Sequence, residues 1–233
     1  MRLVALSQPR NGVVTALVQI EPRAGWKTYW RNPGAAGMAP ELNFSGSTNL
    51  TLKSISYPVP EIGQDEAGRF VGYHRPVSLV IEFEKPDETA PAELDLKALV
   101  GICEAVCLPF TAEFKLSLDP TIPEGEEFSA LMMAQSEMPE RPRADFAVRS
   151  LKKSADGKSL VADVLIPDAT GVDVAAAASR GVNLGKDPTV TVEGRNAKVV
   201  VPVKRIEQTG APHQITLLVK SGKRAIETTL ALD

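Results

Sequence analysis

The sequence predicts an all-β protein that consists of two β-sandwiches in series. Apolar and polar residues alternate with a period of two in many short runs, and long amphipathic helices are absent. Turn residues recur roughly every 8–15 residues, a spacing typical of sandwiches with short strands. The length of 233 residues exceeds what most single domains need, which favours two domains.

The clearest strand patterns lie in the first half. Residues 110–118 place apolar side chains at every even position and polar side chains between them, which predicts a half-buried strand. Residues 94–102 form a matching run upstream. Residues 32–34, Asn-Pro-Gly, are predicted to form a turn. Further strand candidates in this half are 13–20, 50–57 and 77–83.

Composition changes near residue 120. Residues 119–127 are rich in proline and acid, a short helix is predicted at 128–136, and 138–143 has the character of a linker. We therefore predict a first sandwich at 1–120, a linker with a short helix at 121–143, and a second sandwich at 144–233. Strand candidates after the linker are 146–150, 160–166, 189–192, 198–203, 214–219 and 225–232, while 174–178 fits a short helix or a buried run.

Charge and hydropathy exclude several classes of function. The 26 basic and 29 acidic residues give a net charge of −3 without a basic stripe, which argues against a nucleic-acid partner. The longest apolar runs, such as 160–166, are far shorter than the roughly 20 residues of a membrane-spanning helix, so direct membrane insertion is not expected. No signal peptide is visible after Met1, as in a mature exported domain or a cytosolic protein.

The most informative feature is the cysteine pair. Cys103 and Cys107 are the only cysteines, and strand-like patterns flank them on both sides. The simplest geometry is a β-hairpin with both cysteines at its tip, because facing residues of antiparallel strands bring their Cβ atoms close enough for a disulfide.

The residues alone leave three roles open for this pair. A structural disulfide would close a five-residue ring and stabilise the fold by only about 2 kcal/mol. A redox-active disulfide fits an exposed hairpin tip. Metal binding is the third reading, with two thiolates for Cu(I) or zinc. Zinc would need two further ligands, for which the chain offers only His74 and His213. Cu(I) could instead be bound with the help of methionines, and the candidates are Met38, Met132, Met133 and Met138.

Other catalytic motifs do not occur. The sequence contains no Walker A, GxGxxG, HExxH or GxSxG pattern, so we expect neither a cofactor nor a catalytic metal.

Several segments together resemble the N-terminal periplasmic domains of the DsbD/ScsB family. Residues 25–34, Gly-Trp-Lys-Thr-Tyr-Trp-Arg-Asn-Pro-Gly, carry the longest match. The resemblance covers roughly residues 1–120, is nearest to the ScsB-like branch linked to copper tolerance, and is weaker over 145–233. Further matches follow in the same order at 40–42, 44–47, 57–60, 72–73 and 101–109.

This resemblance implies a fold, an activity and partners. It implies immunoglobulin-like sandwiches, a periplasmic location, and a protein-disulfide reductase or thiol:disulfide oxidoreductase domain in which Cys103 and Cys107 are the exchanging pair. Electrons would come from a transmembrane thiol reductase domain or subunit and pass to periplasmic thioredoxin-fold proteins. The rival hypothesis is a non-catalytic immunoglobulin-like binding module with a structural disulfide or a Cu(I) site.

The resemblance also implies a cap and a partner surface. Phe70, Gly72 and the adjoining Tyr73 fit the family's Phe-x-Gly cap segment, in which Phe70 would shield the sulfurs. Two departures stand out: the cysteines are closer together than in DsbD, and Gly68-Arg69 replaces the acidic residues before the cap phenylalanine. Three aromatic residues are predicted to be either sandwich core or a wall beside the cysteines that receives partners; they are Trp26, Tyr29 and Trp30.

Overall fold

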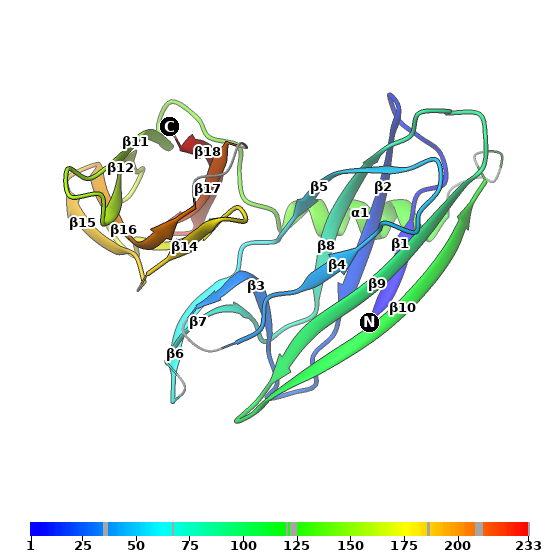
Figure 1. Cartoon of the computed structure of the whole chain (residues 1–233), viewed down its shortest axis with the longest axis horizontal. Helices are drawn as coiled ribbons and strands as arrows, with labels where there is room; N and C mark the ends of the chain where they lie inside the picture. Colours follow the sequence, from blue (N-terminus) through cyan, green and yellow to red (C-terminus); the bar gives the residue numbers. More distant parts are fainter. Residues whose placement is uncertain are drawn as a thin grey trace. The chain divides into compact units, whose positions relative to one another are not determined.

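The computed structural model describes residues 1–34, 37–66, 68–119, 121, 125–185, 187–207 and 212–232 (Figure 1). These residues group into two compact units. The first comprises 1–33, 37–61 and 72–138, and the second comprises Gly34, 62–71 and 139–233.

The first unit contains a four-stranded antiparallel sheet in the order β1-β2-β8-β5. In its centre Ala16 pairs with Ile81, and both side chains are fully buried. The bounds are β1 (Arg2–Ala5), β2 (Val13–Ile20), β8 (Val77–Glu84) and β5 (Thr51–Ser56).

A second sheet of this unit has the order β10-β9-β4. Strands β9 (Ala92–Cys103) and β10 (Cys107–Leu118) form a long hairpin, and β4 (Glu41–Asn43) pairs with β9 on its other side. Leu94 and Leu96 on β9 are fully buried, and Phe44 contacts Phe83 of β8 edge-on at 5.0 Å between ring centroids. The apolar faces of the two sheets thus form a sandwich core.

Three further strands form a small sheet in the order β3-β7-β6. They are β3 (Thr28–Gly34), β7 (Gly68–Tyr73) and β6 (Glu61–Asp65). The division between the two units passes through β7, because residues 62–71 group with the second unit and residues 72–138 with the first. The turn predicted at 32–34 was wrong, since these residues continue β3.

Helix α1 (Glu126–Ser136) begins two residues before the helix predicted at 128–136. Leu131 and Ala134 are its buried residues, and they pack with Val4, Leu6 and Leu17 of the first unit. This burial on one side explains why a short helix is stable here, because helices of this length depend on tertiary packing. None of the helices in the described part of the chain is long and apolar enough to span a membrane.

The second unit is a separate β-sandwich. One sheet has the order β11-β12-β16-β14, with β15 also paired to β16, and the other has the order β13-β17-β18. Its core is aliphatic apart from Phe146 and includes Leu160, Val199 and Leu217. The bounds are β11 (Ala147–Lys153), β12 (Ser159–Leu165), β13 (Asp173–Ala178), β14 (Val182–Leu184), β15 (Thr189–Glu193), β16 (Asn196–Ile206), β17 (His213–Ser221) and β18 (Arg224–Leu232).

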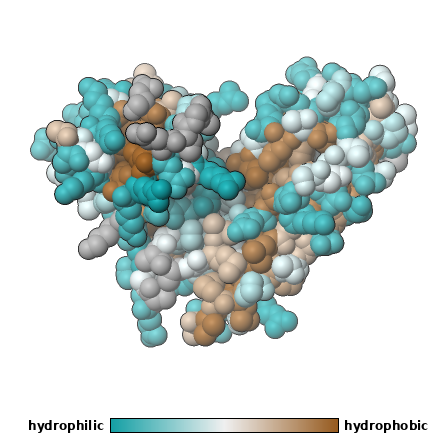
Figure 2. Space-filling model, viewed as in Figure 1, coloured by the Kyte–Doolittle hydropathy of each residue, from teal (hydrophilic) through white to brown (hydrophobic). Residues whose placement is uncertain are grey.

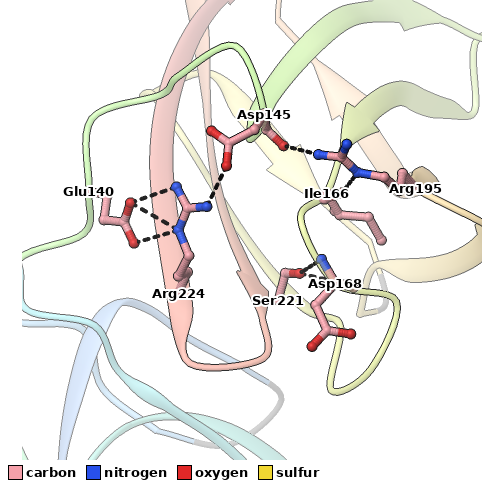
Figure 3. Close-up of polar contacts among 7 residues, drawn as sticks. All are labelled: Glu140, Asp145, Ile166, Asp168, Arg195, Ser221 and Arg224. Atoms are coloured by element: carbon pink, nitrogen blue, oxygen red, sulfur yellow. Dashed lines mark hydrogen bonds and ion pairs between the residues drawn. The ribbon is translucent and has the colours of Figure 1, made fainter.

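The segment leading into the second sandwich is fastened to β18. The guanidinium of Arg224 donates hydrogen bonds to both carboxylate oxygens of Glu140 and, at 2.6 Å, to Asp145 (Figure 3). These hydrogen bonds hold the pKa of Glu140 and of Asp145 below their usual values. Two neighbouring contacts hold the adjacent loops: Arg195 binds the carbonyl of Ile166, and Ser221 binds the backbone of Asp168.

The predicted fold class is confirmed: both units are all-β sandwiches, and one short helix is described. The segment 174–178, which fitted a short helix or a buried run, forms most of strand β13. Its residues 174–177 are buried in succession and so on both faces, and a strand buried on both faces lacks the polar alternation that identifies strands in a sequence.

Candidate functional site

The two cysteines form a disulfide at the tip of the β9–β10 hairpin, as predicted. Cys107 is the direct cross-strand partner of Cys103, and their Cα atoms are 4.1 Å apart. Such facing positions place the Cβ atoms close enough for a disulfide. Glu104, Ala105 and Val106 make the connecting loop and are exposed.

The two sulfur-bearing residues differ in environment. Cys103 is only 1% exposed, and its backbone exchanges two hydrogen bonds with Lys27, at 2.8 and 2.9 Å. Cys107 is exposed and lies on β10, an edge strand of its sheet. One cysteine is therefore held between two strands, and the other faces outward, where a second protein can approach it.

The hydroxyl of Tyr29 contacts the exposed cysteine. This hydroxyl lies 3.6 Å from Sγ of Cys107, within hydrogen-bonding range for sulfur, although the tyrosine is only 2% exposed. Gly37 fits against this ring: a Cβ at Gly37 would lie 2.6 Å from the Tyr29 ring. Because Gly37 has no side chain, the backbone passes directly over the Tyr29 ring and holds this ring in place.

Exposed apolar side chains surround the tip. Val106 is 69% exposed, Leu108 51% and Phe110 46%. Leu108 and Phe110 line an open groove of about 440 Å³ together with Ile20 and the half-buried Trp26. Figure 2 shows hydrophobic surface, in brown, at the lower end of the view, where Figure 1 places the hairpin tip. Exposed apolar groups gathered in one place are typical of a protein-binding surface.

The remaining aromatic residues of the predicted site are buried. Trp30 is fully buried, and the Tyr73 hydroxyl donates to the carbonyl of Pro58 at 2.8 Å. Phe70 is 7% exposed, and its ring lies against Gly63, where a Cβ would come within 2.6 Å of it. The structure thus brings Tyr29 to the cysteines and Trp26 to the neighbouring groove, and places Trp30 in the core.

His74 and the methionines of α1, which were considered as metal ligands, lie in other surroundings. His74 lies 3.0 Å from Glu61 through its Nδ1 atom, an ion pair when the histidine is protonated. Burial raises the pKa of Glu61, but the hydrogen bonds and charge of His74 outweigh this and lower it. Met132 and Met133 are exposed on α1. In the described ranges no three His, Cys, Asp or Glu side chains are close enough together to hold a metal ion.

Sequence reasoning did not identify two features of the site. The alternating pattern at 110–118 predicted that Phe110 lies on a buried face, yet Phe110 is 46% exposed, as is the neighbouring Leu108 at 51%. The contact between Tyr29 and Cys107 joins residues 78 positions apart, and no local pattern indicates it. The signal that the sequence offered for a binding surface was the presence of two bulky apolar residues, Leu108 and Phe110, shortly after Cys107 at the hairpin tip.

Comparison with known proteins places these features in a family. The family model for the N-terminal region of thiol:disulfide interchange protein DsbD matches residues 3–119. The crystal structure of the N-terminal periplasmic domain of ScsB from Proteus mirabilis superposes with a TM-score of 0.67 at 20% identity and covers 99% of this chain and 91% of that chain.

The other comparisons add little. An endo-fucoidan hydrolase from glycoside hydrolase family 107 is 8% identical, covers 97% of this chain and 34% of its own, and its TM-score of 0.21 supports no inference. No curated protein matches the chain. With the family model spanning the sandwich that carries the hairpin-tip disulfide, the chain belongs to the family of DsbD N-terminal thiol:disulfide interchange domains.

Proposed function

We propose that the chain is a periplasmic thiol–disulfide exchange module that relays electrons from a membrane thiol reductase to thioredoxin-fold proteins. The observation that carries the proposal is the asymmetry of the pair, with Cys107 exposed and Cys103 buried. The family model and the periplasmic origin of the similar ScsB domain support the activity and the location.

The exchange proceeds in two balanced steps. In the reduced module the Cys107 thiolate attacks a sulfur of the partner's disulfide, which forms a mixed disulfide and releases one partner thiolate. The Cys103 thiolate then attacks Sγ of Cys107, which closes the intramolecular disulfide and releases the second partner thiolate. Two electrons pass to the partner, whose two thiolates take up protons, and a membrane dithiol reverses the change in the module.

Neighbouring residues have distinct proposed roles. The Tyr29 hydroxyl, 3.6 Å from Sγ of Cys107, is placed to donate a hydrogen bond to the thiolate. Trp26, Leu108 and Phe110 supply an apolar surface for the partner. We assign Phe70 to the cap segment by the family resemblance; its ring is 7% exposed and lies against Gly63.

The first test is the reduction potential of the cysteine pair, measured by equilibration with dithiothreitol or glutathione buffers and thiol trapping. An exchange module is expected at about −180 to −270 mV. A value well below about −300 mV would identify a structural disulfide and overturn the proposal.

The second test compares two single-cysteine variants in the full chain. In Cys103→Ser the remaining Cys107 is expected to react with iodoacetamide about tenfold faster than Cys103 does in Cys107→Ser, because access controls thiol reactivity. Equal rates in folded variants would contradict the assignment of Cys107 as the partner-facing cysteine.

A further inference from the structure

Arg69 lies directly before Phe70 and binds three groups of the second unit. Its guanidinium is 3.4 Å from the Asp173 carboxylate, 3.3 Å from the Asp187 carboxylate, and donates a 2.7 Å hydrogen bond to the carbonyl of Val174. The Arg69 side chain is only 17% exposed. These contacts lie within one compact unit, since residues 62–71 group with 139–233.

The contacts suit an arginine and no other cation. A planar guanidinium offers five donors in a fixed fork, so it can serve two carboxylates and a carbonyl at once, whereas a lysine ammonium acts as a point charge. Asp173 and Val174 open strand β13, and Asp187 follows β14. Arg69 therefore fastens the start of β7 to two separate segments of the second sandwich.

Strand β7 continues from Arg69 to the neighbourhood of the disulfide. Its Gly72 packs so closely on β3 that a Cβ there would lie 2.2 Å from the carbonyl oxygen of Thr28 and 3.2 Å from Cα of Tyr29. Tyr29 in turn contacts Cys107 through its hydroxyl. One strand thus begins at the Arg69 contacts and ends against the residue beside the exposed sulfur.

We propose that Arg69 is a positioning residue through which the second sandwich controls the reactivity of the disulfide. By holding the start of β7, Arg69 restrains the strand that carries Phe70 and supports Tyr29. Loss of the restraint lets this strand move away and opens the protein-facing side of the disulfide, where Cys103 is buried, so that reagents reach this side as well as the exposed Cys107. The inference rests on the proposed exchange function and assigns to the second sandwich a role in regulating it.

The test uses the full chain with Arg69→Gln and measures the second-order rate of disulfide reduction by dithiothreitol. The rate is expected to rise by about threefold or more, the size of effect seen when a residue that couples two parts of a protein is changed. The double variant Asp173→Asn with Asp187→Asn should show a rise in the same direction. Arg69→Lys should fall between the wild type and Arg69→Gln.

Arg224→Gln is the matched control, because Arg224 also binds two carboxylates of the second unit but lies on β18. Its reduction rate should equal that of the wild type. An unchanged rate in folded Arg69→Gln, or an equal rise in both variants, would overturn the proposal. Equal rises would show a general loosening of the second sandwich.

Hydrogen exchange gives a readout that does not depend on redox chemistry. Arg69→Gln should accelerate amide exchange in 68–73 and in the Tyr29 segment of β3, with little change in β16. If the wild-type disulfide resists dithiothreitol altogether, the exchange function fails, and amide exchange alone decides whether Arg69 restrains β7. Unchanged protection of 68–73 would then overturn the positioning role as well.

Discussion

The hydroxyl oxygen of Tyr29 lies 3.6 Å from Sγ of Cys107, although 78 residues separate them in the sequence. The tyrosine is buried, whereas the cysteine is exposed, so the contact reaches the outward-facing sulfur from the protein side. Because the Tyr29 side chain is already held in place by burial, it loses little conformational freedom when it donates a hydrogen bond to a thiolate. In the reduced protein the hydroxyl is therefore placed to donate a hydrogen bond to the Cys107 thiolate.

Tyr29→Phe tests this contact without removing the ring. In the reduced protein, Cys107 of the variant should react with iodoacetamide at pH 7 about fivefold more slowly, equivalent to roughly 1 kcal/mol, the net contribution of one hydrogen bond. The measurement is made in the Cys103→Ser background so that one thiol reacts. If the rate does not change, the hydroxyl does not stabilise the thiolate.

The apolar surface beside the tip is tested with Phe110→Ala. Phe110 is 46% exposed, so its removal should hardly affect folding, but it should slow reduction of an oxidised thioredoxin-fold protein by about 5–30-fold through weaker binding. The reaction of the same variant with dithiothreitol should match the wild type, since a small thiol does not need the surface. Met133→Ala is the control, because Met133 is an exposed apolar residue on α1.

A slower reaction of Phe110→Ala with both the protein and dithiothreitol would contradict this assignment. That result would show that the substitution alters the disulfide itself. An effect of Met133→Ala as large as that of Phe110→Ala would instead show that any exposed apolar residue contributes, and that the groove has no special role.

Gly72→Ala tests the close approach of β7 to β3. The added Cβ would lie 2.2 Å from the Thr28 carbonyl oxygen, so the two strands must separate. The free energy of unfolding in urea should fall by about 1–3 kcal/mol, the usual cost of overpacking. Equal stability of Gly72→Ala and the wild type would mean that the strands can adjust freely.

The local part of the structure could be predicted from the sequence. The alternation at 94–102 and 110–118 predicted both strands of the hairpin, and the spacing of Cys103 and Cys107 placed both cysteines at its tip, with a disulfide or a metal site as the alternatives. These predictions rest on the geometry of strands, because side chains alternate between the two faces and residues of antiparallel strands face each other across the hairpin.

The long-range part could not be predicted in the same way. Residues 32–34, Asn-Pro-Gly, have the composition of a turn, but pairing between β3 and β7 keeps them in a strand. Likewise Arg69 was notable in the sequence only as a departure from the family pattern, and its partners Asp173 and Asp187 are more than 100 residues away. Such contacts depend on topology, which a single sequence does not encode in any local period.

Arg224→Gln tests how the linker is fastened, and its effect should depend on pH. The hydrogen bonds from Arg224 lower the pKa of Glu140 below 4.5 and of Asp145 below 3.8 in the folded protein. Carboxyls with depressed pKa values stabilise the fold fully above their unfolded pKa values, and this contribution disappears as the pH falls through the folded values. The variant should therefore be less stable than the wild type at neutral pH.

The difference between the two proteins should then shrink as the pH falls below about 4, because protonated Glu140 and Asp145 no longer pair with the arginine. The difference is measured by urea unfolding of the wild type and Arg224→Gln at pH values from neutral to below about 4. Arg205→Gln removes an exposed pair with Glu207, at 3.7 Å, and should have little effect at any pH. A constant difference between wild type and Arg224→Gln would show that Arg224 stabilises the linker through packing on Phe146, over which its guanidinium lies at 5.5 Å, and not through its charge.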